Sequence, residues 1–272
     1  MKKAFNGCCI IPCRRGSKRI PGKNLKKLNG KPLLSYILNT ALASNCFNLF
    51  GVHVASDDPD ALQLAAEMGA VPFEIPSEMA QDQSPVTPVL SKCLQNIPKN
   101  QSTVPPQVPA FACYLRATSP FVRTETIKRA VESLNMSPLD TDAKGQIVDS
   151  VVSVHHVTGA HPSRFKCIDP VTGLLVDAYS EYKEGLEPRS SSSLVALHRS
   201  SCVTVVRREI LLGSDPSVAH PSMWGNRIKP LVVEDEKECI DINTPLEFDF
   251  AEYLCHQAGP HSPLKEGTCF MK

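Results

Sequence analysis

Eight basic residues gather in a short segment near the N-terminus of a chain whose formal charge is only +1. The segment reads IIPCRRGSKRIPGKNLKKLNGKP, and its cations are Arg14, Arg15, Lys18, Arg19, Lys23, Lys26, Lys27 and Lys31. Gly16 and Gly22 allow the backbone to turn and to present N–H groups to an anion. Arginine grips phosphate oxygens with paired hydrogen bonds, and lysine supplies a point charge. The segment therefore predicts a binding site for a triphosphate.

Other known phosphate loops do not fit this segment. A Walker loop needs G-x-x-x-x-G-K-[ST], whereas here five residues separate Gly16 from Gly22, and Asn24 replaces the magnesium-binding hydroxyl. The dinucleotide pattern G-x-G-x-x-G is also absent. A solvated basic loop or a nucleic-acid patch stays open as an alternative. Cations interleaved with Gly and Pro directly after an apolar strand favour phosphate binding instead.

A second candidate site lies near the C-terminus, in the segment ECIDINTPLEFD. Asp241 and Asn243 are two residues apart, so their side chains point to the same side of an extended segment. Mg²⁺ that arrives with a triphosphate prefers one or two carboxylates together with phosphate oxygens and waters. We therefore expect Asp241 and Asn243 to hold Mg²⁺, and Asp249 to lie near them at the start of a helix. The alternative is that Asp241 is an ordinary turn acid.

Alternating strands and helices must position these residues. The strand-like runs are CCIIP, FGVHVAS, FACYLRA, IVDSVVSVHHV and SSCVTVVRREIL, and the helical patterns are KPLLSYILNTALAS, DDPDALQLAAEMG and TETIKRAVESL. This alternation predicts an α/β fold with a mostly parallel, doubly wound sheet. Because ligands of such sheets bind outside the carboxyl ends of the strands, the residues just after each strand are where chemistry is expected.

Two stretches interrupt this alternation. Residues 96–110 are rich in Pro and polar residues and are expected to form a surface loop. Residues 156–198 show little α/β rhythm and are expected to form an inserted flap. We find no internal repeat, so the sequence predicts a single domain over residues 1–272 that carries this flap.

Composition and charge argue against several classes of protein. The chain is 42% hydrophobic and 21% charged, which is typical of a soluble globular protein. A formal charge of +1 gives no overall attraction for nucleic acid or a membrane. No apolar run approaches the roughly 18–20 residues of a membrane helix, and Pro12 and Arg14 interrupt the N-terminal apolar stretch, so no signal peptide is expected. Eleven scattered cysteines without a C-x-x-C pair are expected to be reduced, mostly buried thiols of a cytoplasmic protein.

The N-terminal segment resembles the signature of the acylneuraminate cytidylyltransferases, I-x-A-R-x-G-S-K-x-I-x-x-K-N. That family includes the cytidylyltransferases for pseudaminic and legionaminic acid, and is more distantly similar to 3-deoxy-manno-octulosonate cytidylyltransferase. The resemblance continues through VHVASDDPDALQLAAEMG, MAQDQSPVTPVL, YLRATSPFVRTETI, HPSRFK and CIDINTPLEFDFAEYL. It implies a three-layer α/β/α, Rossmann-like nucleotidyltransferase fold, and a homodimer in which the flap reaches over the neighbour's site.

The resemblance also implies roles for individual residues. The catalytic residues would be Arg14, Lys18, Lys23 and Asp241. The nucleotide would be bound by Arg14, Gly16, Ser17, Lys18, Lys23, Asn24, Ser56, Asp57 and Ser84. The sugar would be bound by Arg116, Thr118, Ser119, Lys166 and Arg189. Asp57 has an alternative interpretation, because an acid before DPDAL is a natural helix cap.

Departures from the family pattern lie mostly around the expected sugar site. Arg116 stands where the family has a glutamine that helps to read the sugar, and Asn243 stands where it has a second aspartate. HRSSCVTV replaces the usual N-G-A-I-Y, and of the R-Q-x-L-P segment only Arg189 remains. Binding of the nucleotide is therefore a firmer expectation than the identity of the acceptor.

The implied activity is transfer of CMP from CTP to the anomeric hydroxyl of a sialic-acid-like nonulosonic acid, with Mg²⁺ as cofactor and pyrophosphate as the second product. The expected ligands are thus CTP and a sugar acid. Two alternatives stay open. In the first, the acceptor is another acid, such as pseudaminate, legionaminate or an octulosonate. In the second, the chain binds nucleotide without catalysis.

Overall fold

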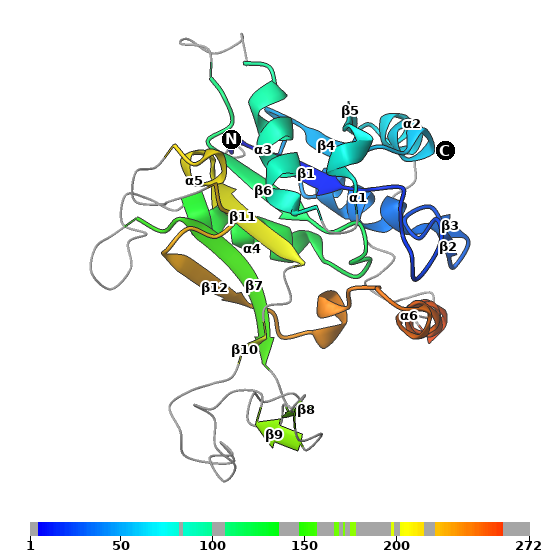
Figure 1. The fold of residues 1–272 in the computed structure, drawn as a ribbon. Helices are drawn as coiled ribbons and strands as arrows, with labels where there is room; N and C mark the ends of the chain where they lie inside the picture. The colour runs from blue at the N-terminus through cyan, green and yellow to red at the C-terminus, as the bar shows by residue number, and fades with distance from the viewer. Residues whose placement is uncertain are drawn as a thin grey trace.

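Four parallel strands form one half of the main sheet in the order β5–β4–β1–β6, with β5 at its edge (Figure 1). The computed structural model describes residues 5–81, 84–99, 107–135, 147–156, 166–168, 171, 175–177, 197–198, 202–214 and 221–257. The four strands are β1 (Gly7–Pro12), β4 (Val52–Ser56), β5 (Val71–Glu74) and β6 (Phe111–Leu115). Strands β1, β4 and β6 are buried almost throughout, as expected for parallel strands that are covered on both faces.

The other half of the sheet is mixed. Strand β11 (Val203–Arg207) lies antiparallel between β6 and β7 (Ser150–His156). β7 pairs in turn with β10 (Leu197–His198) in the antiparallel sense and with β12 (Ile228–Val232) in the parallel sense. The α/β class and its parallel core are therefore confirmed, whereas the antiparallel insertion of β11 was not predicted. The end of the run expected to form that strand is instead a short helix, α5 (Arg208–Leu212).

Helices cover both faces of the sheet, which gives the expected three layers (Figure 1). Cys9 and Ile11 of β1 pack with residues of α1, α2 and α4, whereas Cys8 and Ile10 pack with residues of α3 and α5. These helices are α1 (Leu33–Ala43), α2 (Pro59–Glu67), α3 (Val86–Asn96) and α4 (Thr124–Asn135). The alternation along β1 is that of an extended strand, whose successive side chains point to opposite faces.

A third apolar cluster joins the segments that flank the candidate site. It contains Ile20, Leu28, Leu33, Phe121, Ile242, Phe248 and Ala251. The last two belong to α6 (Pro245–Gln257). Leu28 belongs to a small hairpin, β2 (Lys27–Leu28) with β3 (Lys31–Pro32), whose two-residue turn is Asn29–Gly30 at φ values of 45° and 80°. Positive φ at both positions is what a tight hairpin turn requires. The cluster therefore ties the basic segment to the acidic one.

Strands β8 (Lys166–Ile168) and β9 (Leu175–Asp177) pair antiparallel as a separate two-stranded sheet. They fall within residues 156–198, most of which lie outside the described residues, so the inserted flap stays a prediction. Among the residues that the structure describes, no helix combines the length and the apolar character needed to cross a membrane.

Candidate active site

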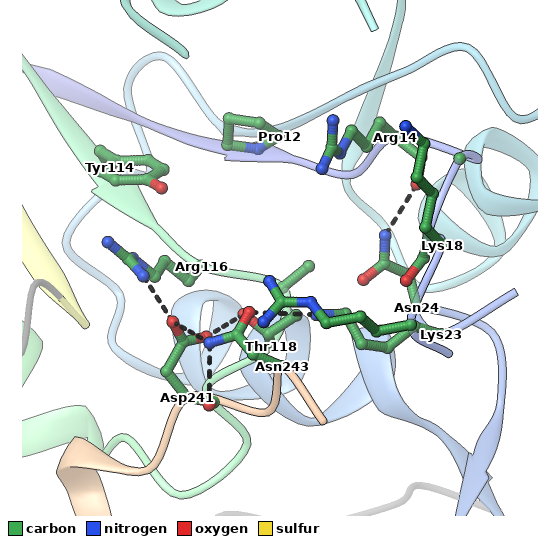
Figure 2. Close-up of a pocket in the computed structure, with 14 residues that line it drawn as sticks. Pro12, Arg14, Lys18, Lys23, Asn24, Tyr114, Arg116, Thr118, Asp241 and Asn243 are labelled. Atoms are coloured by element: carbon green, nitrogen blue, oxygen red, sulfur yellow. Dashed lines mark hydrogen bonds and ion pairs between the residues drawn. The ribbon is translucent and has the colours of Figure 1, made fainter. Parts of the chain in front are cut away.

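A pocket of about 430 Å³ opens where β1 and β6 end, between the basic segment and the acidic one (Figure 2). Its lining residues are Pro12, Arg14, Gly16, Ser17, Lys18, Arg19, Lys23, Asn24, Tyr114, Arg116, Ala117, Thr118, Asp241 and Asn243. Five of these carry a positive charge and one carries a carboxylate. The pocket thus concentrates positive charge in a nearly neutral chain, as a site for a polyanion requires.

The basic part of the wall is the segment of residues 13–26, which we call the phosphate loop. The side-chain amide of Asn24 donates to the backbone oxygen of Arg14 at 3.0 Å and so closes the loop on itself. Gly22 has a φ of 62°, a left-handed conformation that glycine adopts without strain. Arg14 donates through Nη1 to the backbone oxygen of Gln81 at 2.8 Å, which anchors its guanidinium against the segment before α3.

Ser56 and Asp57 support the phosphate loop from behind. The backbone N–H of Arg15 donates to Oδ1 of Asp57 at 2.7 Å. Ser56 is fully buried, and its hydroxyl donates to the backbone oxygen of Cys13 and accepts from the backbone N–H of Asp58 at 3.0 Å. Neither residue lines the pocket. The helix cap is Asp58, which accepts from the backbone N–H of Asp60 at 3.1 Å.

Cys13 lies at the start of the phosphate loop without being reactive. Burial, aided by the charge of Asp58, raises the pKa of its thiol to about 12. The thiol therefore stays protonated near neutral pH, and Cys13 is not a candidate nucleophile.

Lys23 links the phosphate loop to the acidic segment. Its ammonium donates to the backbone oxygen of Ile242 at 2.5 Å and lies 3.4 Å from Oδ1 of Asn243. Burial lowers the pKa of Lys23, the charge of Asp241 opposes that shift, and the charges of Arg19 and Arg14 add to it. The two contacts leave part of the ammonium's donor capacity for a ligand, since it carries three N–H bonds.

Asp241 is the centre of the acidic wall. Its Oδ2 accepts from Nη1 of Arg116 at 2.5 Å and from Nδ2 of Asn243 at 3.0 Å, and its Oδ1 accepts from the hydroxyl of Thr118. Figure 2 shows this group of four side chains facing Arg14 and Lys18 across the pocket. Residues predicted separately for the metal and for the sugar are thus brought into one cluster.

Helix α6 holds the acidic segment in place through its N-terminal cap. Oε2 of Glu247 accepts from the backbone N–H groups of Asn243 at 2.6 Å and Thr244 at 2.8 Å, while the Thr244 hydroxyl accepts from the backbone N–H of Glu247 at 3.3 Å. This reciprocal pair is a capping box. On the other side, the backbone N–H of Ile242 donates to the backbone oxygen of Thr118 at 2.9 Å. Asp241 and Asn243 are therefore fixed between α6 and the residues that follow β6.

The donor set at Asp241 fits a magnesium ion that arrives with substrate phosphates. No cluster of three or more His, Cys, Asp or Glu side chains suited to a metal occurs in the described part of the chain. Mg²⁺ does not need such a cage, because it commonly binds through one or two carboxylates plus phosphate oxygens and waters. Asp241 offers the carboxylate and Asn243 an amide oxygen, both on the pocket wall.

Besides Ser56 and Asp57, the predicted residues Ser84 and Ser119 do not line the described pocket. Ser119 is fully buried, and its hydroxyl has no hydrogen-bond partner among the described residues. Ser84 donates to the backbone oxygen of Glu78 at 3.2 Å. Lys166 is described only as part of β8, and Arg189 lies outside the described residues. The roles of these residues stay predictions.

Tyr114 and Arg19 line the pocket although the sequence did not single them out as site residues. Tyr114 precedes Arg116 by two positions, so the alternation of side chains along an extended segment was the signal that could have found it. Arg19 was counted among the cations, but nothing in its spacing separated it from the neighbouring exposed Arg15, which lies outside the lining.

The fold and this cation-rich pocket define a nucleotidyltransferase of the α/β type. CMP:2-keto-3-deoxy-manno-octonic acid synthetase, solved in complex with CTP, shares the fold with a TM-score of 0.64 at 18% sequence identity, over 92% of this chain and 99% of that one. The sequence matches the cytidylyltransferase family over residues 8–164, more than half of its length. The chain belongs to that family and is a cytidylyltransferase.

Two similar proteins come from bacteria. CMP-N,N'-diacetyllegionaminic acid synthase of Legionella pneumophila is 29% identical over 249 residues, which are 90% of this chain and 94% of that protein. Pseudaminic acid cytidylyltransferase of Campylobacter jejuni is 37% identical over 125 residues, which are 46% of this chain and 51% of that protein. The chain is therefore similar over nearly its full length to the first and over about half of the second.

Proposed function

We propose that this chain transfers CMP from CTP to the anomeric hydroxyl of a sialic-acid-like nonulosonic acid and releases pyrophosphate. The observation that carries the proposal is the pocket in which Asp241 and Asn243 on one wall face the cations of the phosphate loop on the other. The names of the relatives support the class of acceptor, since both act on nonulosonic acids. At these identities they leave the particular acid open.

The proposed roles follow from the chemistry of the lining. The acceptor's hydroxyl oxygen attacks the α-phosphorus of CTP and gives up its proton to water. An O–P bond forms, the bond between the α-phosphorus and the bridging oxygen of the β-phosphate breaks, and its electron pair leaves with pyrophosphate. Arg14 and Lys18 bind and neutralise the departing pyrophosphate, and the backbone N–H groups of Gly16 and Ser17, which line the pocket, are proposed to donate to its oxygens. Catalysis is then mainly orientation and charge neutralisation, as in phosphoryl transfer generally.

Asp241 and Asn243 would hold Mg²⁺ in the loaded enzyme. When bound, the ion supplies charge neutralisation at the α-phosphate and acidifies an oxygen that it coordinates. Lys23 keeps Asn243 and the backbone at Ile242 in position through its two contacts. Loss of Lys23 is thus expected to disturb both walls of the pocket.

We propose that the acceptor lies against Arg116 and Thr118, at the end of the pocket away from the phosphate loop. Lys166 and Arg189 are the further cations proposed for the sugar's carboxylate, and the flap that carries them is proposed to act in a homodimer. Substitution of the family's glutamine by Arg116 is the observation that favours the two alternatives, a different sugar acid or loss of catalysis.

Pyrophosphate release tests this function. The purified chain is given CTP and Mg²⁺ with N-acetylneuraminate, pseudaminate, legionaminate or an octulosonate in separate reactions. We expect release with one nonulosonic acid, lost in Lys18→Ala and Asp241→Ala and kept in Lys27→Ala, whose residue is exposed and outside the lining. Silence with all four acceptors, alongside measurable CTP binding, would contradict the proposal and favour the non-catalytic alternative.

A further inference from the structure

We infer that Arg116 competes with the metal ion for Asp241, so that a divalent cation binds this pocket tightly only together with the phosphates of the nucleotide. The inference rests on the proposed function, because it concerns the same site. It assigns to Arg116 a property that follows from the contacts of this chain: the residue positions Asp241 and weakens metal binding to the free protein.

The contact that carries the inference is short and partly shielded from water. Nη1 of Arg116 lies 2.5 Å from Oδ2 of Asp241, and the two side chains are 33% and 16% exposed. Hydrogen bonds between ionised partners are stronger than those between neutral groups. A metal that takes up this carboxylate oxygen must therefore displace a guanidinium that already neutralises its charge.

The remaining oxygens of the site are also engaged. A carboxylate offers about four lone-pair positions, and three donors, from Arg116, Thr118 and Asn243, occupy Asp241. The amide oxygen of Asn243, the other proposed ligand, lies 3.4 Å from the ammonium of Lys23. Each proposed ligand thus already faces a cationic side chain.

The local charge balance points the same way. The pocket lining holds five cations and only Asp241 as a carboxylate, so a divalent cation entering alone meets a positive field. The triphosphate reverses this balance, because its charge pairs with the phosphate loop and supplies metal ligands of its own. Metal binding and nucleotide binding should therefore be strongly coupled, and by linkage the coupling is mutual.

The guanidinium of Arg116 is not fully satisfied where it stands. Its Nε is buried and has no hydrogen-bond partner among the described residues. Buried polar groups of a purely structural ion pair are normally all paired. An arginine with an unpaired donor inside a ligand pocket is instead suited to exchange partners when a ligand enters.

Binding of Mn²⁺, used as a paramagnetic probe of the magnesium site, tests the inference without reference to turnover. Free Mn²⁺ is measured by electron paramagnetic resonance against the wild type, Arg116→Gln, Asp241→Asn and the double variant. Arg123→Gln is the matched control, since Arg123 also pairs with acids, Asp235 and Glu238, but outside the pocket lining. Thermal unfolding of each variant checks that the fold is kept.

Without nucleotide, we expect Arg116→Gln to bind Mn²⁺ about tenfold more tightly than the wild type. The variant lacks the charged hydrogen bond to Asp241 that the metal must break in the wild type. The gain should vanish in the double variant and be absent in Arg123→Gln. In the presence of CTP, the wild type and Arg116→Gln should differ much less. These results would support competition at Asp241.

Equal or weaker Mn²⁺ binding by Arg116→Gln would overturn the inference, and so would a gain that persists in the double variant. The result is separable from the proposed function. Turnover with the acceptor panel and CTP binding without metal are measured on the same preparations. If the chain is silent with every acceptor but Arg116→Gln gains Mn²⁺ affinity, the inference holds and the proposed activity fails. If the chain is active but Arg116→Gln shows no gain, the activity holds and the inference fails.

Discussion

Lys18 lines the pocket from the phosphate loop, and its ammonium is expected to bind a CTP phosphate directly. Lys18→Met keeps the length of the side chain and removes its charge. We expect the Kd for CTP, measured by calorimetry, to rise about tenfold or more, since hydrogen bonds to charged groups are the strong ones. Lys27→Met is the control, because Lys27 is exposed and lies in β2 outside the lining. An equal loss in both variants would indicate a general charge effect.

Asp57 acts on the site through a hydrogen bond to the backbone of the phosphate loop. Its carboxylate accepts from the N–H of Arg15, so Asp57→Ala leaves that donor unpaired and loosens the phosphate loop. We expect the KM for CTP to rise about three- to tenfold with a smaller change in kcat. The contact orders the loop before CTP binds, so its loss weakens the enzyme–CTP complex and the transition state alike. Asp57→Asn, which keeps an acceptor, should recover part of the loss.

The exposed Asp60 in the first turn of α2 provides the control for this prediction. Asp60→Ala removes a nearby acid that makes no contact with the phosphate loop. If it raises the KM as much as Asp57→Ala does, the effect comes from the general charge around α2 and the loop contact is not its cause.

Individual residues of the site differ in how far the sequence could predict them. Asp241 and Asn243 were predictable as a pair, because two positions in an extended segment share a side, and the structure brings both to the pocket wall. The contact between Arg116 and Asp241 was not, because 125 residues separate them and only the paired sheet and the third apolar cluster bring them together. For Ser56 the role in nucleotide binding stays a prediction, since a hydroxyl at a strand end can serve the backbone as well as a ligand.

At the scale of the element, the cap of α6 links stability to the site. Glu247 accepts from two backbone N–H groups, those of Asn243 and Thr244. Glu247→Ala is expected to lower the free energy of unfolding by about 1 kcal/mol, as loss of a helix cap does, and to lower activity because Asn243 is no longer held. Urea unfolding and pyrophosphate release measure the two effects on one preparation.

Two further variants sharpen the test of the cap. Glu247→Gln keeps an oxygen acceptor and should retain most of the stability. Asp249→Ala removes an exposed acid of the same helix that makes no capping contact, so its stability should match the wild type. A loss in Asp249→Ala as large as that in Glu247→Ala would mean that net charge near α6, and no specific cap, sets the effect.

Elements were predictable where a local signal existed. The apolar runs gave β1, β4 and β6, and the helical patterns gave α1, α2 and α4, because periodicity is local. The antiparallel course of β11 had no local signal, since a buried strand looks alike in either direction and its partners, β6 and β7, are distant in sequence. The β2–β3 hairpin did carry a signal, the Asn29–Gly30 pair.

At the scale of the whole molecule, charge placement matters more than charge total. The chain carries a formal charge of +1, yet five cations meet in one pocket because strands β1 and β6 end side by side. Such a site is expected to attract CTP more strongly at low ionic strength, while the nearly neutral chain as a whole gives no long-range pull. The fold, by gathering segments from both ends of the sequence, creates the local field.

A homodimer with a flap over the neighbouring site would divide each site between two subunits. Asp241→Ala and Arg189→Ala are each expected to be inactive alone. Mixed in equal amounts and allowed to exchange subunits, they should recover about a quarter of the wild-type rate of pyrophosphate release, since half of the dimers would be mixed and each would hold one intact site. Mixing Asp241→Ala with Lys18→Ala is the control, because both residues lie in one pocket of one chain, and no activity should return. Sedimentation of the wild type must show a dimer. No recovery in the first mixture, despite proven exchange, would place the whole site within one subunit.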